Sequence, residues 1–138
     1  MKLFYYQDER GNFGDDLNPW IFYQYAPNVF NGEGDHLLGI GTLINSRAPA
    51  QGKKRVFGSG VGYHQPANIN DDWQFLFVRG PLSAQALNLP ADKGVTDPAI
   101  LLADMVDRCA ARELITFMPH QVSAMNGDWK ACLLYTSP

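Results

Sequence analysis

Arg79 and the glycine-flanked segments before it contain the side chains most able to do chemistry. Arg79 follows the apolar segment 75–78 and precedes Gly80, which predicts a fixed cation at the carboxyl end of a strand. A guanidinium in that position can bind a phosphate or a carboxylate through paired hydrogen bonds. The alternative is a surface arginine that packs over the sheet edge or pairs with Asp97.

The segment 11–16 combines two glycines with two adjacent carboxylates. The glycines allow backbone amides to approach a ligand closely, and the N–H groups of a helix that follows favour an anion. Two carboxylates repel a phosphate unless they face helix amides, sugar hydroxyls or a cation. A tight turn with a capping side chain explains the same residues without a ligand. The candidate substrate-binding residues in this segment are Asn12, Gly14, Asp15 and Asp16.

Gly58, Ser59 and Gly60 follow another apolar segment, and ligands bind at the carboxyl ends of strands in open parallel sheets. These three residues are therefore also candidates for substrate binding. The segment lacks the glycine spacing of a dinucleotide-binding turn, and close packing of strand against helix explains the glycines equally well. His120 is a weak candidate for a catalytic acid or base, because histidine titrates near neutrality.

To bring these residues together, the strands must end at one edge of a sheet. Short apolar runs alternate with helix-like stretches, which indicates a parallel sheet with crossover helices. The predicted fold class is α/β, a Rossmann-like parallel sheet with flanking helices. The predicted strands are Lys2 to Tyr6, His36 to Ile40, Arg55 to Gly58, Gln74 to Val78, Gly94 to Thr96 and Leu114 to Met118.

The helix predictions depend on local start and stop signals. Asn18 followed by Pro19 predicts a helix with Asn18 as its N-cap, and this helix should end before Pro27. Asp97 followed by Pro98 predicts the start of another helix of one or two turns.

A further helix is predicted from Pro81 to Leu87, with Leu82, Ala86 and Leu87 on its buried face. The segment 42–54 reads as an exposed loop or short helix, and the segment 65–72 reads as a loop.

Composition and charge exclude several classes of protein. The chain has 138 residues, a net charge of -3 and 46% apolar residues, which is enough to form a core but provides no basic surface for nucleic acid. The two cysteines have no metal-ligand spacing, so no metal site is predicted. No apolar run approaches the length of a transmembrane helix or a signal peptide. A soluble, cytoplasmic protein is therefore predicted.

Six motifs, in order and spacing, resemble those of the polysaccharide pyruvyl transferase family, and most closely those of its bacterial exopolysaccharide members. The likeness covers residues 1–130. The motifs are Asn12-Phe13-Gly14-Asp15-Asp16-Leu17-Asn18, Gly39-Ile40-Gly41-Thr42, Val56-Phe57-Gly58-Ser59-Gly60-Val61-Gly62, Val78-Arg79-Gly80-Pro81-Leu82-Ser83, Thr96-Asp97-Pro98-Ala99-Ile100-Leu101-Leu102 and Phe117-Met118-Pro119-His120.

The resemblance implies a two-domain fold similar to the B-type glycosyltransferases, of which this chain is the amino-terminal half. It implies transfer of a pyruvyl group from phosphoenolpyruvate to two hydroxyls of a sugar, with formation of a cyclic ketal and no redox or nucleotide cofactor. The implied partners are phosphoenolpyruvate and a glycan acceptor. A peripheral association with a lipid-linked glycan stays open, as do the acceptor sugar and the oligomeric state.

By the same resemblance, Arg79 binds the carboxylate or phosphate of phosphoenolpyruvate, and the segments 12–16 and 58–62 form the floor of the cleft. The principal catalytic residues are expected in the carboxyl half, so the fragment alone is expected to be inactive. The expected organisation is a domain over residues 1–112 and the start of a second over residues 113–131. Residues 132–138 are an expected non-native tail, because they match one reading frame of a common sequencing adapter.

Two other functions fit the same pattern. One is half of a sugar-nucleotide glycosyltransferase of similar architecture. The other is a non-catalytic module that binds a sugar or a phosphate.

Overall fold

The computed structural model describes residues 1–9, 11–107 and 121–127. The chain divides into two compact units, Met1–Asp107 and Arg108–Pro138. The first unit contains the sheet and all the predicted site residues except His120. The predicted domain boundary after residue 112, the strand from Leu114 to Met118 and the tail 132–138 lie outside the described residues and stay predictions.

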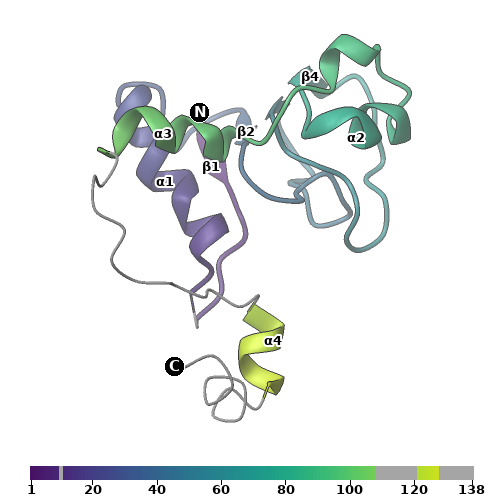
Figure 1. The fold of residues 1–138 in the computed structure, drawn as a ribbon. Coiled ribbons are helices and arrows are strands. Elements are labelled where there is room, and N and C mark those ends of the chain that lie inside the picture. Colours follow the sequence, from purple (N-terminus) through teal and green to yellow (C-terminus); the bar gives the residue numbers. More distant parts are fainter. Residues whose placement is uncertain (10, 108–120, 128–138) are drawn as a thin grey trace, which may run out of the picture. The chain divides into compact units, whose positions relative to one another are not determined.

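Four parallel strands form the sheet in the order β1-β2-β3-β4 (Figure 1). The strands are β1 (Lys2–Phe4), β2 (His36–Leu38), β3 (Lys54–Phe57) and β4 (Trp73–Phe77). Because all four are parallel, their carboxyl ends meet at one edge. The predicted α/β class with a parallel sheet is confirmed.

The predicted strand from Gly94 to Thr96 is wrong. It is reduced to one parallel bridge between Val78 and Gly94. The N–H of Val95 donates to the carbonyl of Val78, and two residues later Asp97 already caps a short 3-10 helix. The chain therefore turns away before a second ladder step can form.

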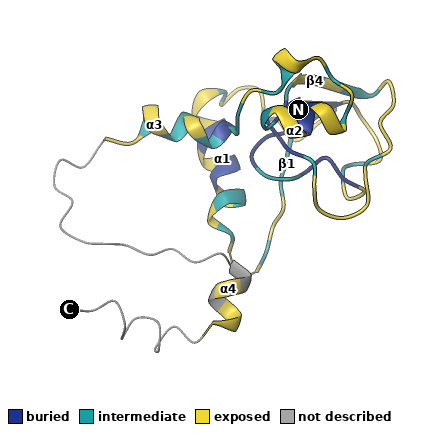
Figure 2. Ribbon diagram, turned by 45° about the vertical axis from the view of Figure 1, so that its right-hand side comes forward, coloured by how far each residue is buried: buried dark blue, intermediate teal, exposed yellow. Residues whose placement is uncertain are grey.

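Helices cover both faces of the sheet, as expected when strand residues alternate between two buried faces. Leu37 and Phe57 pack with α1 (Phe13–Tyr25), η2 (Pro98–Leu101) and α3 (Leu102–Met105), whereas Leu38 and Val56 pack with the buried side of α2 (Gly80–Ala86). In Figure 2 the buried residues of this unit lie in α1, the strands and the adjoining loops, while α3 is intermediate or exposed. The remaining helices are η1 (Ala91–Lys93) and α4 (Gln121–Asn126), and α4 belongs to the second unit.

The start of α1 differs from the prediction. The helix begins at Phe13, with Asn12 as the extended N-cap residue, rather than at Pro19 after an Asn18 cap. Asn18 is fully buried, and its side chain donates to the carbonyl of Ile40 and accepts from the N–H of Ile40. A side chain engaged with the end of β2 is not free to cap a helix.

The same asparagine explains how α1 contains Pro19. A proline inside a helix removes the N–H that would bond to the carbonyl four residues earlier, which here belongs to Asp15. The Nδ2 of Asn18 donates to that carbonyl at 2.9 Å instead. The prediction that the helix ends before Pro27 is confirmed, because α1 ends at Tyr25.

Two predictions of burial are wrong. Ser83 and Ala84 form the buried side of α2, whereas Leu82 is 78% exposed and Ala86 is exposed. The segment 42–54 is a loop, but Leu43, Ile44 and Lys54 in it are buried. Both errors have one cause: which apolar residues are covered depends on the neighbouring segment and not on local periodicity.

Candidate functional site

Arg79 follows β4, and its guanidinium is held by two other segments. Its Nη2 donates to the Oγ1 of Thr42 at 2.7 Å, and its Nη1 lies 3.8 Å from Oδ2 of Asp97. Its backbone N–H donates to the carbonyl of Ser59. The predicted alternative of a pair with Asp97 is therefore present, but the guanidinium stays half-buried at the carboxyl edge of the sheet rather than over its side.

Gly60 lies directly beneath this guanidinium. A Cβ at position 60 would lie 2.6 Å from Nη2 of Arg79 and 2.7 Å from both Cζ and Nε. These nearly equal distances show that the flat face of the guanidinium, and not its edge, rests on Gly60. The glycine is required by this close approach.

Ser59 and Gly58 shape the loop beneath the site. Ser59 is fully buried; its Oγ accepts from the N–H of Leu43 and donates to the carbonyl of Gly41. Gly58 has a φ of +82°, and a Cβ there would lie 2.4 Å from Pro98. Both residues join β3 to its neighbours, so their observed role is to shape the loop that supports Arg79.

Asp15 lies in the first turn of α1 and faces the loop after β2. Its carboxylate accepts from the Nδ2 of Asn12, and its Oδ1 lies 2.8 Å from where a Cβ of Gly41 would be. Burial raises the pKa of Asp15 to about 6, and the carboxylates of Asp16 and Asp97 raise it further. This carboxyl group can take up or release a proton near neutral pH.

The turn before α1 is occupied by its own side chains. The exposed Asp16 accepts from the backbone N–H of Asn12 through Oδ2, and Gly14 is part of the helix rather than of a turn. The helix start is thus already supplied with carboxylates. A phosphate has no free place there, whereas a donor such as a sugar hydroxyl suits these oxygens.

Four segments meet at this edge of the sheet. They are the start of α1 with Asp15, the loop after β2 with Thr42, the loop after β3 with Gly60, and Arg79 with its neighbour Asp97. The structure therefore brings together the segments 12–16, 58–60 and 79, as predicted, although their contacts with substrate stay predictions. Asp97 also caps η2, because its Oδ1 accepts from the N–H of Ala99.

Sequence reasoning did not select Thr42 or Asp97 as site residues. The available signal was their position, because each follows the end of a strand or bridge at the same edge as Arg79. His120, the weak catalytic candidate, lies outside the described residues.

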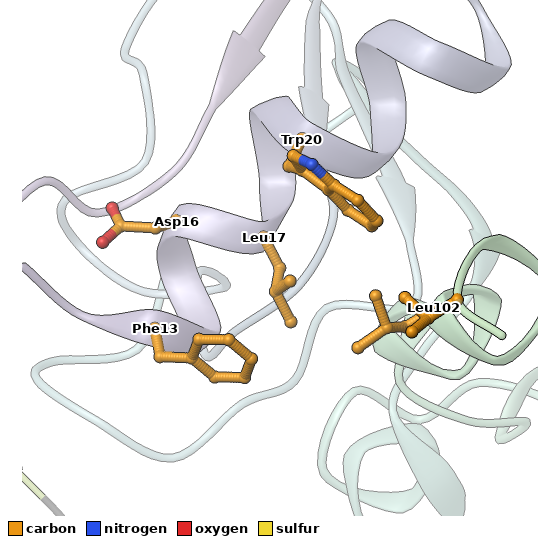
Figure 3. Close-up of a pocket in the computed structure, with 6 residues that line it drawn as sticks. Phe13, Asp16, Leu17, Trp20 and Leu102 are labelled. Atoms are coloured by element: carbon orange, nitrogen blue, oxygen red, sulfur yellow. The ribbon is translucent and has the colours of Figure 1, made fainter. Parts of the chain in front are cut away.

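An apolar groove of about 390 Å³ runs along α1 next to this edge (Figure 3). Phe13, Leu17 and Trp20 extend from α1 towards Leu102, and the carboxylate of Asp16 points away from them at the rim. Arg79 does not line the groove. The groove is therefore separate from the cluster of charged groups.

Two searches of the described part of the chain gave negative results. Over residues 1–9, 11–107 and 121–127, no three histidine, cysteine or acidic side chains form a group that could hold a metal ion. No helix in that part is both long enough and apolar enough to cross a membrane.

The chain is similar to the succinoglycan biosynthesis protein ExoV of Rhizobium meliloti (strain 1021). The two sequences are 36% identical over an alignment of 137 residues, which covers 95% of this chain and 43% of ExoV. The chain thus spans less than half the length of this relative. No model of a known protein family matches the chain, and no solved structure matches it.

Proposed function

We propose that this chain contributes the amino-terminal wall of the active site of a pyruvyl transferase in polysaccharide biosynthesis. The proposed reaction moves a pyruvyl group from phosphoenolpyruvate to two hydroxyls of a sugar and releases phosphate. The observation that carries the proposal is the fixed guanidinium of Arg79, next to the half-buried carboxyl group of Asp15. The similarity to ExoV, named as a succinoglycan biosynthesis protein, supports the pathway.

Arg79 is the proposed contact for the donor. One face of its guanidinium rests on Gly60, and one Nη2 hydrogen is bonded to Thr42, so its other N–H groups can bind a carboxylate or phosphate. The position of the group is set before the ligand arrives, which reduces the entropy that binding must overcome.

Asp15 is the proposed contact for the acceptor. Ketal formation removes a proton from each of two sugar hydroxyls; one proton ends on the methyl group formed from the enol carbon, and the other on the released phosphate. A carboxyl group with a pKa of about 6 can carry such a proton at neutral pH. The adjacent Asp16 offers further oxygens to sugar hydroxyls.

The charges at this edge also limit what the chain does alone. Phosphoenolpyruvate carries a carboxylate and a phosphate, and the site places three carboxylates, Asp15, Asp16 and Asp97, around the guanidinium of Arg79. Additional cations are needed to neutralise the donor and its leaving phosphate. We therefore propose that turnover requires basic groups beyond this cluster, with no cofactor other than the donor substrate.

Calorimetric titration of the 138-residue chain with phosphoenolpyruvate tests the proposal. We expect binding, and we expect Arg79→Ala to weaken it by roughly 30-fold or more, because a hydrogen-bonded charge contact contributes about 2 kcal/mol. The free energy of unfolding should change by no more than about 0.5 kcal/mol, as is usual for an exposed side chain.

Arg55→Ala is the matched control, because Arg55 pairs with Asp35 at the opposite edge of the sheet. Its binding isotherm should equal that of the unmodified chain. If Arg79→Ala binds phosphoenolpyruvate as well as the unmodified chain does, the donor site is not here. If a sugar nucleotide such as UDP-glucose binds in preference to phosphoenolpyruvate, the glycosyltransferase alternative replaces the proposal.

A further inference from the structure

The pose of Arg79 depends on a residue from a distant part of the chain. Thr42 precedes Arg79 by 37 positions, and its Oγ1 is the hydrogen-bond acceptor for Nη2 at 2.7 Å. The other near group, Asp97, is 3.8 Å from Nη1, which is beyond hydrogen-bond distance. The short directional contact to the guanidinium is therefore made by a neutral hydroxyl and not by the carboxylate.

We propose that Thr42 is a positioning residue that, together with the bare backbone of Gly60, fixes the guanidinium of Arg79 in the orientation that receives an anion. Gly60 supports the face of the guanidinium and prevents it from moving towards the sheet. Thr42 holds one corner and so prevents rotation in the plane of the group. An arginine side chain has many rotamers, and a site that leaves it free must order it when the ligand binds.

The choice of a threonine has a chemical consequence. A carboxylate in place of Thr42 would pair with Arg79 and offset its charge, whereas a hydroxyl accepts the hydrogen bond and leaves the positive charge available. The loop that carries Thr42 is itself fixed, because the carbonyl of Thr42 accepts from Asn45 and the neighbouring Gly41 carbonyl accepts from Ser59 and Gly60. Thr42 is thus a rigid support rather than a mobile loop side chain.

Two substitutions separate the hydroxyl from the shape of the side chain. Thr42→Val keeps the branched shape and removes the acceptor, and Thr42→Ser keeps the acceptor. NMR of the unliganded chain reports the pose directly, through the Nε–H signal of Arg79 assigned by its loss in Arg79→Lys. We expect this signal to shift in Thr42→Val and to return towards its original position in Thr42→Ser.

Binding supplies the second readout, and it rests on the proposed function. Thr42→Val should weaken phosphoenolpyruvate binding about fivefold, and Thr42→Ser should restore it. In the Arg79→Ala background, Thr42→Val should have no further effect, because a positioning residue acts only through the group it holds.

The proposal is overturned if Thr42→Val leaves the Arg79 signal unchanged, or if its effect on binding persists in the Arg79→Ala background. It is also overturned if Thr42→Ser fails to restore the signal, since the methyl group rather than the hydroxyl would then set the pose. An unbound chain with the expected NMR shifts would contradict the proposed function and leave the positioning role established. The two failures are therefore distinguishable.

Discussion

The two edges of the sheet use the same types of side chain in opposite ways. At the amino edge, Lys54 lies 3.7 Å from Asp72, and Arg55 lies 3.1 Å from Asp35. At the carboxyl edge, Arg79 lies 3.8 Å from Asp97, and its hydrogen bond goes to a neutral threonine. The cations at the amino edge are paired with the loops that precede their strands, whereas the guanidinium at the carboxyl edge remains available.

The carboxylates differ in the same direction. The hydrogen bond from the Arg55 side chain holds the pKa of Asp35 below its usual value, and the backbone N–H of Lys53 assists. Burial, with the charges of Asp16 and Asp97, raises the pKa of Asp15 to about 6. Ionisation therefore favours the fold at the amino edge and opposes it at the carboxyl edge. A charge that is kept at a cost to stability is typical of a functional site.

The largest expected contrast is between two glycines. Gly60→Ala places a methyl group where the Arg79 guanidinium now rests, so the flexible side chain must move away. We expect phosphoenolpyruvate binding to weaken about tenfold or more, while the free energy of unfolding changes by less than about 1 kcal/mol. Calorimetric titration and thermal melting measure the two effects separately.

Gly52, in the loop before β3, is the counterpart at the amino edge. It has a φ of +76°, and a Cβ there would lie 3.2 Å from the carbonyl oxygen of Gly34. Gly52→Ala should lower the free energy of unfolding by about 1 kcal/mol and leave binding unchanged. A loss of binding in Gly52→Ala, or none in Gly60→Ala, would remove the distinction between the edges.

The next contrast concerns Asp15. Its pKa is higher in the folded chain than the ordinary 3.8, so the folded state binds more protons between those values, and the stability contribution falls as pH rises towards about 6. Asp15→Asn removes this penalty while its amide oxygen can still accept from Asn12. The advantage of Asp15→Asn in melting temperature should therefore grow from about pH 4 to about pH 7.

Partial exposure of Asp15 reduces the size of that effect, so the measured quantity is its sign. Melting curves of the two proteins at each pH give it directly. A difference that is constant with pH would show that the carboxyl group is not perturbed. A difference that shrinks as pH rises would reverse the assignment.

The smallest effect is expected at Asp35, and its sign is opposite. Since the pKa of Asp35 is lower in the folded chain than the ordinary 3.8, its contribution to stability is present above that value and is lost as pH falls through the folded value. Asp35→Asn should therefore be slightly less stable than the unmodified chain at neutral pH and equal to it in strong acid. Melting curves with the same sign of pH dependence at Asp15 and Asp35 would contradict the comparison.

Local signals predicted much of the fold and part of the site. The parallel sheet followed from apolar runs alternating with helical stretches, and the cap at Asp97 followed from its position before Pro98. The position of Arg79 at the end of a strand was predicted for the same reason. The start of α1 was not, because Asn18 has the same local signal as a cap but bonds to Ile40, 22 residues away.

Order along the chain was thus enough to determine which residues stand at the ends of strands, since strand patterns and caps depend on near neighbours. Only the tertiary structure decided how those residues act on one another. The support of Arg79 by Thr42 and Gly60, and the raised pKa of Asp15, arise from segments that are distant in sequence. Hydrogen bonds, close approach and desolvation depend on separation in space, and no local pattern encodes that separation.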